Sequence, residues 1–184
     1  MSSSDPSGGA AALCVVVGFP KIVVFDVDYT LWAGDVDMDI ELPLKSVAGK
    51  VTDNRNRGID LFPDVRAMFK RLSSAGCTLA FASRTTDAET CEAFLKAQGL
   101  WEYIEGRRYL FQAYPSCGSA KTRHFCEIFS GTGLGPPDAL FFDDLRENTV
   151  AAAAQGICSI LVQREGLTMG LLDKGLAEWR STAK

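Results

Sequence analysis

Polar side chains of the kinds that handle phosphate follow three apolar runs of the sequence. The runs at residues 22–25, 77–82 and 139–142 are continuous and have the length of buried strands. The side chains that close them, together with a lysine that opens a later helical segment, are Asp26, Asp28, Ser83, Arg84, Asp143, Asp144 and Lys121. Carboxylate oxygens are hard ligands that suit Mg²⁺, and the cations and the hydroxyl group can bind phosphate oxygens. The residue types therefore outline a site for phosphoryl transfer.

The segments between these residues predict how they are brought together. Strands are predicted at 22–26, 77–83, 139–144 and 158–162, and helices at 63–76, 87–99, 119–131, 146–156 and 168–180. Strands buried on both faces and alternating with helices are typical of an α/β fold. We expect a Rossmann-like, doubly wound, mostly parallel sheet with helices on both faces. Ligands of such sheets bind beyond the carboxyl ends of the strands, where all these polar residues fall.

The domain organisation is predicted to be simple. Residues 1–12 form a Ser-, Gly- and Ala-rich tail that we expect to be disordered, and residues 13–184 form one domain. Residues 32–62 interrupt the alternation as a polar connection, which predicts a short flap. At about 30 residues this insert is below the ~50 residues of an independent domain, so no large cap domain is expected.

Composition excludes several classes of partner. The 19 basic and 23 acidic residues form no basic run, which argues against nucleic acid. The apolar stretch near the N-terminus is about ten residues long and lacks a basic n-region, so neither a membrane span nor a secretory signal is expected. The six cysteines form no CxxC pair, which favours a reducing compartment. We expect a cytoplasmic monomer.

The motifs carry a family resemblance. The stretch DVDYT, the segment ASRT, Lys121 and the segment FFDDLREN occur in the order of the four motifs of the haloacid dehalogenase (HAD) superfamily. The stretches FDVDYTLW, RGIDLFPDV and YPSCGSAKTRHF resemble, more narrowly, the magnesium-dependent phosphatase-1 family, over about residues 21–170. An isolated DxD is equally typical of a turn with solvated aspartates, so the ordered combination carries the resemblance.

The resemblance implies a role for each acidic residue. Asp26 would be the nucleophile that forms an aspartyl-phosphate, and Asp28 the general acid and base. Asp26, the main-chain carbonyl of Asp28 and Asp144 would bind Mg²⁺. Asp143 would act as a supporting or water-mediated partner, and its carboxylate could pair with Lys121.

The same resemblance assigns the phosphate contacts. Ser83 and Lys121 would bind the transferring phosphoryl oxygens, and Lys121 would also orient Asp26. Arg84, at the mouth of the site, would bind phosphate or an acidic substrate group, although a structural ion pair is a competing role. Asn148 would support the metal through a bound water, or would serve only the start of its helix. The implied substrates are phosphotyrosine-like compounds, including phosphopeptides, or small sugar phosphates of the fructosamine phosphate kind.

Two alternative functions remain open at this stage. One is a regulatory domain that binds phosphate but turns it over weakly. The other is a cysteine-dependent phosphatase, because Cys117 and Arg123 have the CxxxxxR spacing of that class. Against the second, residues 109–116 are broken by Pro115 and predict no strand before Cys117. His124, the single histidine of the chain, is expected on a helix surface or in packing.

Overall fold

A five-stranded parallel sheet forms the centre of the protein. The computed structural model describes residues 18–115 and 121–182, so the predicted tail at 1–12, Cys117 and the first residues of the helix expected at 119–131 lie outside the described residues. The strands run in the order β5-β4-β1-β6-β7 and all neighbours are parallel. Their bounds are Ile22–Phe25 (β1), Thr78–Ser83 (β4), Phe111–Ala113 (β5), Ala139–Asp143 (β6) and Cys158–Leu161 (β7). The prediction of a doubly wound α/β fold is confirmed.

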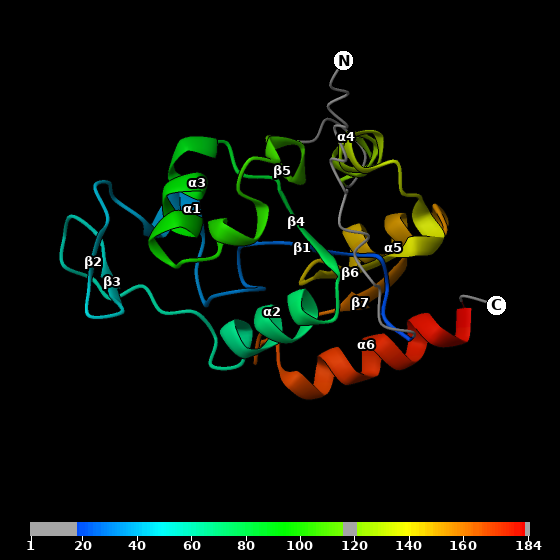
Figure 1. The fold of residues 1–184 in the computed structure, drawn as a ribbon. Coiled ribbons are helices and arrows are strands. Elements are labelled where there is room, and N and C mark those ends of the chain that lie inside the picture. The colour runs from blue at the N-terminus through cyan, green and yellow to red at the C-terminus, as the bar shows by residue number, and fades with distance from the viewer. Residues whose placement is uncertain (1–17, 116–120, 183–184) are drawn as a thin grey trace, which may run out of the picture.

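Helices cover both faces of this sheet. In Figure 1, α2 (Val65–Ser74) and α6 (Met169–Thr182) lie below the strands, and α4 (Thr122–Thr132) and α5 (Arg146–Ala154) lie above them. The helix α3 (Ala88–Ala97) connects β4 to the edge strand β5, and short 3₁₀ turns cover Trp101–Ile104 (η1), Arg108–Leu110 (η2) and Pro136–Asp138 (η3). The apolar stripe of α2 is buried as its periodicity predicts. No helix of the described residues is both long and apolar enough to cross a membrane.

The core is built around the central strand. All four residues of β1 have no exposed surface. The Phe25 ring stacks between Phe69 of α2, at 4.7 Å between ring centroids, and Phe142 of β6, at 5.7 Å. Burial of these three aromatic side chains stabilises the packing of α2 against β1 and β6. The residue that follows β1 is therefore presented from the most enclosed strand of the sheet.

The prediction of no strand within residues 109–116 is wrong. Residues 111–113 form the edge strand β5, which pairs with Phe81–Ser83 of β4. Pro115 does not interrupt it, because the strand ends at Ala113. A strand of three residues that pairs with one neighbour depends on the rest of the sheet for its stability, so its own pattern carries little signal.

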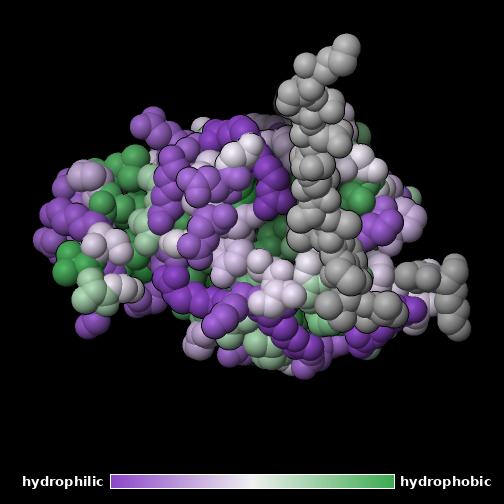
Figure 2. All heavy atoms as spheres, viewed as in Figure 1, coloured by the Kyte–Doolittle hydropathy of each residue, from purple (hydrophilic) through white to green (hydrophobic). Residues whose placement is uncertain are grey.

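The insert has a small structure of its own. It contains the one-turn helix α1 (Val36–Asp39) and an antiparallel hairpin of β2 (Lys45–Val47) and β3 (Lys50–Thr52). The hairpin projects from the body of the molecule (Figure 1), and hydrophobic side chains reach the surface in this region of Figure 2. Met38 and Val47 are 79% and 72% exposed. These elements lie within the predicted insert at residues 32–62, and the action of that insert as a flap stays a prediction.

Candidate active site

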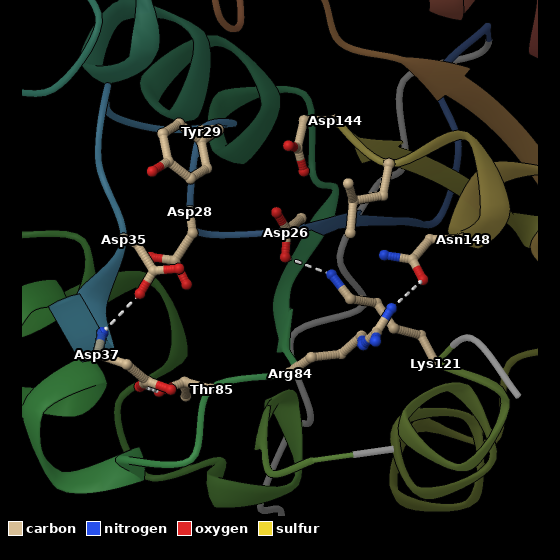
Figure 3. A pocket seen from close by; sticks show the side chains of 11 residues that line it. Asp26, Asp28, Tyr29, Asp35, Asp37, Arg84, Thr85, Lys121, Asp144 and Asn148 are labelled. Atoms are coloured by element: carbon tan, nitrogen blue, oxygen red, sulfur yellow. Dashed lines mark hydrogen bonds and ion pairs between the residues drawn. The ribbon is translucent and has the colours of Figure 1, made fainter. Parts of the chain in front are cut away.

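The predicted site residues gather at the carboxyl edge of the sheet. A pocket of about 390 Å³ opens there, beyond the ends of β1, β4 and β6 (Figure 3). Six of the predicted residues line it: Asp26, Asp28, Arg84, Lys121, Asp144 and Asn148. The other two, Ser83 and Asp143, are fully buried directly beneath it. Tyr29, Asp35, Asp37, Thr85 and Leu145 complete the lining.

Lys121 is the buried cation of the pocket. Its side chain is 1% exposed, and its Nζ donates to the Asp26 carboxylate and, at 2.6 Å, to the Asp143 carboxylate. Burial alone would lower the pKa of Lys121, but these two carboxylates hold it above its usual value. The backbone of Lys121 has a φ of +38°, in the left-handed region that side chains rarely adopt. Such local strain persists where surrounding contacts fix it, which is common at functional sites.

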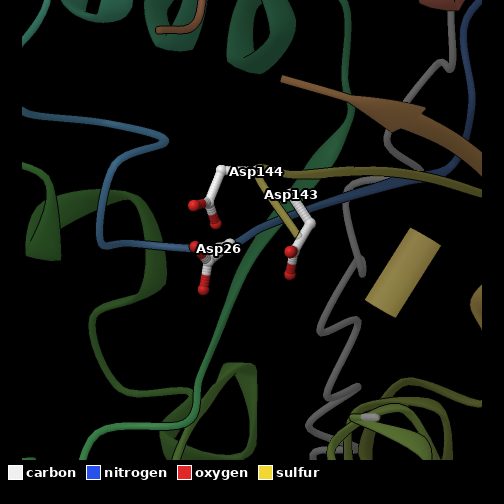
Figure 4. Close-up of side chains that lie close together, drawn as sticks. All are labelled: Asp26, Asp143 and Asp144. Carbon is white, nitrogen blue, oxygen red and sulfur yellow. The ribbon is translucent and has the colours of Figure 1, made fainter. Parts of the chain in front are cut away.

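The three carboxylates of Asp26, Asp143 and Asp144 form a compact cluster of oxygen donors. Each offers a ligand atom within 4.8 Å of the others (Figure 4). Burial raises the pKa of Asp26 well above its usual range, against the attraction of Lys121. Burial and repulsion from Asp143 also raise the pKa of Asp144. Negative charge is therefore costly here, and the donor set fits a hard divalent cation such as Mg²⁺, which would offset that cost.

Asp143 differs from its neighbours because its oxygens are already occupied. Its Oδ1 accepts the Leu145 N–H at 2.8 Å, and the Asn148 amide donates to both of its oxygens at 2.9 Å. Lys121 occupies Oδ2 as well. The predicted pairing of Asp143 with Lys121 is confirmed. Asp144 makes fewer contacts and lines the pocket, so its carboxylate is the more available of the two to a metal ion.

Asp28 lies at the side of the pocket, with one oxygen anchored. Its Oδ1 accepts the Val36 N–H at 2.9 Å and the Trp32 indole N–H at 3.3 Å. Burial raises the pKa of the Asp28 carboxyl to about 7, although the hydrogen bond from Val36 opposes this. A carboxyl group with such a pKa can both give and accept a proton near neutral pH. Val36 begins α1, so the insert helps to hold Asp28 in place.

Arg84 lines the opposite side of the pocket and is already paired. Its guanidinium contacts the Glu147 carboxylate at 2.5 Å and the Asn148 Oδ1 at 3.4 Å (Figure 3). Both members of the ion pair are exposed, with 37% and 65% of their side-chain surfaces accessible. Since exposed pairs contribute little stability, an anionic substrate group can compete with Glu147 for Arg84.

The loop after β4 is held by Asp37, which no sequence motif indicates as a site residue. The Asp37 carboxylate accepts the Thr85 hydroxyl, the Thr86 N–H at 2.9 Å, the Thr86 hydroxyl at 2.8 Å and the Asp87 N–H at 3.3 Å. These bonds hold the pKa of Asp37 below its usual value, against the effect of burial. Asp37 and Thr85 are 48 residues apart in sequence, and no local pattern connects them. The insert thus holds the loop that follows Ser83.

Ser83 itself faces inward in this structure. Its hydroxyl accepts the Thr85 N–H at 3.1 Å, and its side chain has no exposed surface. The backbone carbonyl of Ser83 accepts the His124 Nε2–H at 2.8 Å. A contact between the Ser83 hydroxyl and phosphate stays a prediction.

His124 has the packing role that was expected of it. The imidazole has no exposed surface, stacks on the Tyr114 ring at 4.2 Å, and donates from Nε2 to the Ser83 and Tyr114 carbonyls. Burial lowers its pKa to about 4, so the ring is neutral at pH 7. Arg123, the partner proposed for Cys117, lies over the Tyr114 ring at 4.6 Å and does not line the pocket.

Comparisons with known proteins identify relatives of this chain. A family model described as acid phosphatase matches residues 18–182. A human protein named magnesium-dependent phosphatase 1 is 37% identical over 158 residues, 85% of each chain. A HAD-like hydrolase superfamily protein of Schizosaccharomyces pombe is 31% identical over 141 residues, 72% of this chain and 80% of the other.

The fold has relatives among solved structures as well. A HAD-superfamily hydrolase from Ehrlichia chaffeensis superposes with a TM-score of 0.61 at 14% identity, covering 88% of this chain and 97% of the other. A predicted phosphoglycolate phosphatase from Haemophilus somnus gives 0.60 at 17% identity, covering 80% and 86%. At these identities the likeness concerns the fold alone. Since the family model spans all described residues and both sequence relatives named above exceed 30% identity, the chain belongs to the acid phosphatase family of HAD-like hydrolases.

Proposed function

We propose that the protein is a Mg²⁺-dependent phosphomonoester hydrolase that forms an aspartyl-phosphate on Asp26. The observation that carries this proposal is the contact of a buried lysine, Lys121, with the Asp26 carboxylate at the floor of an acidic pocket. The human relative's name contains the words magnesium-dependent phosphatase, which supports the same conclusion. Asp26, Asp144 and the main-chain carbonyl of Asp28 would hold the ion. When bound, it would offset repulsion between the anionic nucleophile and the phosphate.

The reaction proceeds in two displacements. An Asp26 oxygen forms a bond to phosphorus while the bond from phosphorus to the leaving oxygen breaks, and the Asp28 carboxyl gives that oxygen its proton. Water then attacks phosphorus and gives a proton to the Asp28 carboxylate. The bond from phosphorus to Asp26 breaks, which releases inorganic phosphate and restores both side chains.

The remaining residues bind and orient the phosphate. Lys121 contacts Asp26. From this position its ammonium group can orient the nucleophile and also bind an oxygen of the phosphoryl group. Ser83 is proposed to bind a second oxygen and Arg84 an oxygen or an acidic group of the substrate. Asn148 holds the Asp143 carboxylate, which in turn positions Lys121. We propose phosphotyrosine-like compounds or small sugar phosphates as substrates, because residues 18–115 and 121–182 form no large cap over the pocket.

A direct test detects the intermediate. Phosphate release from an aryl phosphate is measured with Mg²⁺ and with EDTA for the wild type, Asp26→Asn, Asp28→Asn and Cys117→Ser. We expect release only with Mg²⁺, loss of at least about a thousandfold in the first two variants, and wild-type rates in the third. Borohydride reduction during turnover would convert a phosphorylated Asp26 to homoserine, which mass spectrometry detects.

Each alternative function has a different outcome. Activity that survives EDTA and Asp26→Asn but disappears in Cys117→Ser would establish the cysteine mechanism instead. Phosphate binding without turnover of any of a panel of phosphorylated peptides and metabolites would identify a regulatory domain.

A further inference from the structure

A second pocket lies directly beside the catalytic one. Its volume is about 510 Å³, and it shares two lining residues, Tyr29 and Asp144, with the catalytic pocket. Figure 3 shows both on the side of the catalytic pocket that lies away from Arg84 and Thr85. A phosphate on Asp26 therefore has room for its ester group in this direction. The other lining residues are Ala33, Phe62, Leu161, Val162, Gln163 and Arg164.

Four separate chain segments build the second pocket, and contacts tie three of them to one another. The Phe62 N–H donates to the Leu31 carbonyl at 2.9 Å, and the Leu167 N–H donates to the Thr30 carbonyl at 3.2 Å. The Phe62 ring lies against Gly166, where a Cβ would come within 2.1 Å of a ring carbon. Gly166 also has a φ of +71°, which glycine adopts without strain. These contacts hold the wall of the pocket in place before any ligand binds.

Most residues that line the second pocket are apolar or aromatic, and two are charged. Tyr29 is 49% exposed and Phe62 is half-buried, so both rings offer surface to a ligand. Asp144 supplies a carboxylate where the two pockets meet, and Arg164 supplies a guanidinium. Among the described residues, Arg164 has no ion-pair partner. A free guanidinium beside apolar walls suits a ligand with an apolar body and an anionic end.

We infer that this pocket binds the leaving group of the substrate, and that Arg164 selects phosphomonoesters whose leaving group carries a carboxylate. The inference rests on the proposed phosphatase function and narrows its substrates. The leaving group lies between Tyr29 and Phe62, and its carboxylate reaches Arg164 while the phosphate is held at Asp26 and Lys121. Arg164 makes no contact with the reacting atoms, so it determines specificity rather than chemistry.

The test uses two aryl phosphates of nearly equal shape, 4-carboxyphenyl phosphate and 4-carbamoylphenyl phosphate. The kcat/KM for the carboxyl substrate, divided by that for the carbamoyl substrate, is measured in the wild type, in Arg164→Gln and in Arg146→Gln. Arg146 is an exposed arginine that lines neither pocket and has no ion-pair partner among the described residues, which makes it a matched control. Differences in leaving-group reactivity cancel, because the same pair is compared in each protein.

We expect Arg164→Gln to lower the ratio about fivefold, as for an exposed charge pair, and to leave the carbamoyl substrate within about twofold of wild type. Arg146→Gln should keep the wild-type ratio. An unchanged ratio in Arg164→Gln would overturn the inference. An equal fall of the ratio in Arg146→Gln would also overturn it, because the effect would then come from the overall electrostatic field of the protein. Loss of turnover of both substrates in the wild type would instead count against the proposed function.

A binding measurement tests the pocket without turnover. The non-hydrolysable 4-(phosphonomethyl)benzoate and its benzamide are titrated calorimetrically into the wild type and both variants with Mg²⁺. The inference requires the wild type to bind the benzoate about fivefold more tightly than the benzamide. This preference should disappear in Arg164→Gln and persist in Arg146→Gln. Equal affinities for the two compounds in the wild type would overturn it.

Discussion

Replacement of Lys121 by methionine should destabilise the protein strongly, because two buried carboxylates would lose their cation. Lys121 has 1% of its side chain exposed, and the carboxylates of Asp26 and Asp143 that it binds have 9% and 0%. Removal of one partner from a buried ion pair costs about 3–5 kcal/mol, since the remaining charge has neither water nor a counterion. We expect Lys121→Met to lower the free energy of unfolding by this amount, and to lower kcat/KM by about 10²–10³.

The assay is urea denaturation followed by far-UV circular dichroism at pH 7 in EDTA. Lys174→Met is the matched control, since Lys174 is exposed on α6 and its replacement should change the free energy by less than about 0.5 kcal/mol. The double variant Lys121→Met/Asp143→Asn should regain more than about 1 kcal/mol without regaining activity, because it removes one of the two unpaired charges. A cost below about 1 kcal/mol for Lys121→Met, or no recovery in the double variant, would refute the reasoning.

Three further perturbations test the site and its surroundings. Asp37→Asn should lower kcat/KM about tenfold with little loss of stability, because an amide can accept fewer of the bonds that hold the loop at Thr85; unchanged kinetics with an aryl phosphate would contradict this. The unfolding free energy should fall as the pH drops from about 6.5 to about 4, because the unfolded chain protonates His124 in that range while the fold keeps it neutral, and the contribution is on the order of 3 kcal/mol. In His124→Gln, the unfolding free energy from chemical denaturation should depend less on pH in that range. An unaltered slope would contradict the assignment of this pH dependence to His124. Mg²⁺ at saturation should raise the wild-type melting temperature by several degrees, reversibly with EDTA and less in Asp144→Asn, whereas equal shifts in both proteins would exclude Asp144 as a ligand.

The sequence predicted those parts of the site that follow strands. Asp26 and Asp143 come directly after or at the end of apolar runs, and the parallel arrangement brings such positions to one edge. The pairing of Lys121 with Asp143 could be anticipated for the same reason. The alternation of strands and helices is a strong local signal, which explains why the fold class was predicted correctly.

The sequence did not predict features that depend on contacts between distant segments. The role of Asp37 arises from hydrogen bonds across 48 residues or more. The strand β5 has three residues and is stabilised by pairing with β4, so its own periodicity does not reveal it. The inward orientation of the Ser83 hydroxyl depends on the turn of the following backbone, which brings the Thr85 N–H to it. Local patterns thus located the strands, whereas tertiary contacts determined how the loops between them are held.

The position of Asp26 directly after the central strand separates the proposed chemistry from the recognition of the ester group. This separation matters for how such an enzyme acquires new substrates. The proposed nucleophile follows a strand with a neighbour on each side, whereas much of the second pocket is lined by the loop residues Ala33, Phe62, Gln163 and Arg164. Libraries confined to those loop positions can therefore alter the accepted ester while the inherited chemistry stays intact. Natural divergence among paralogues can take the same route, one loop residue at a time.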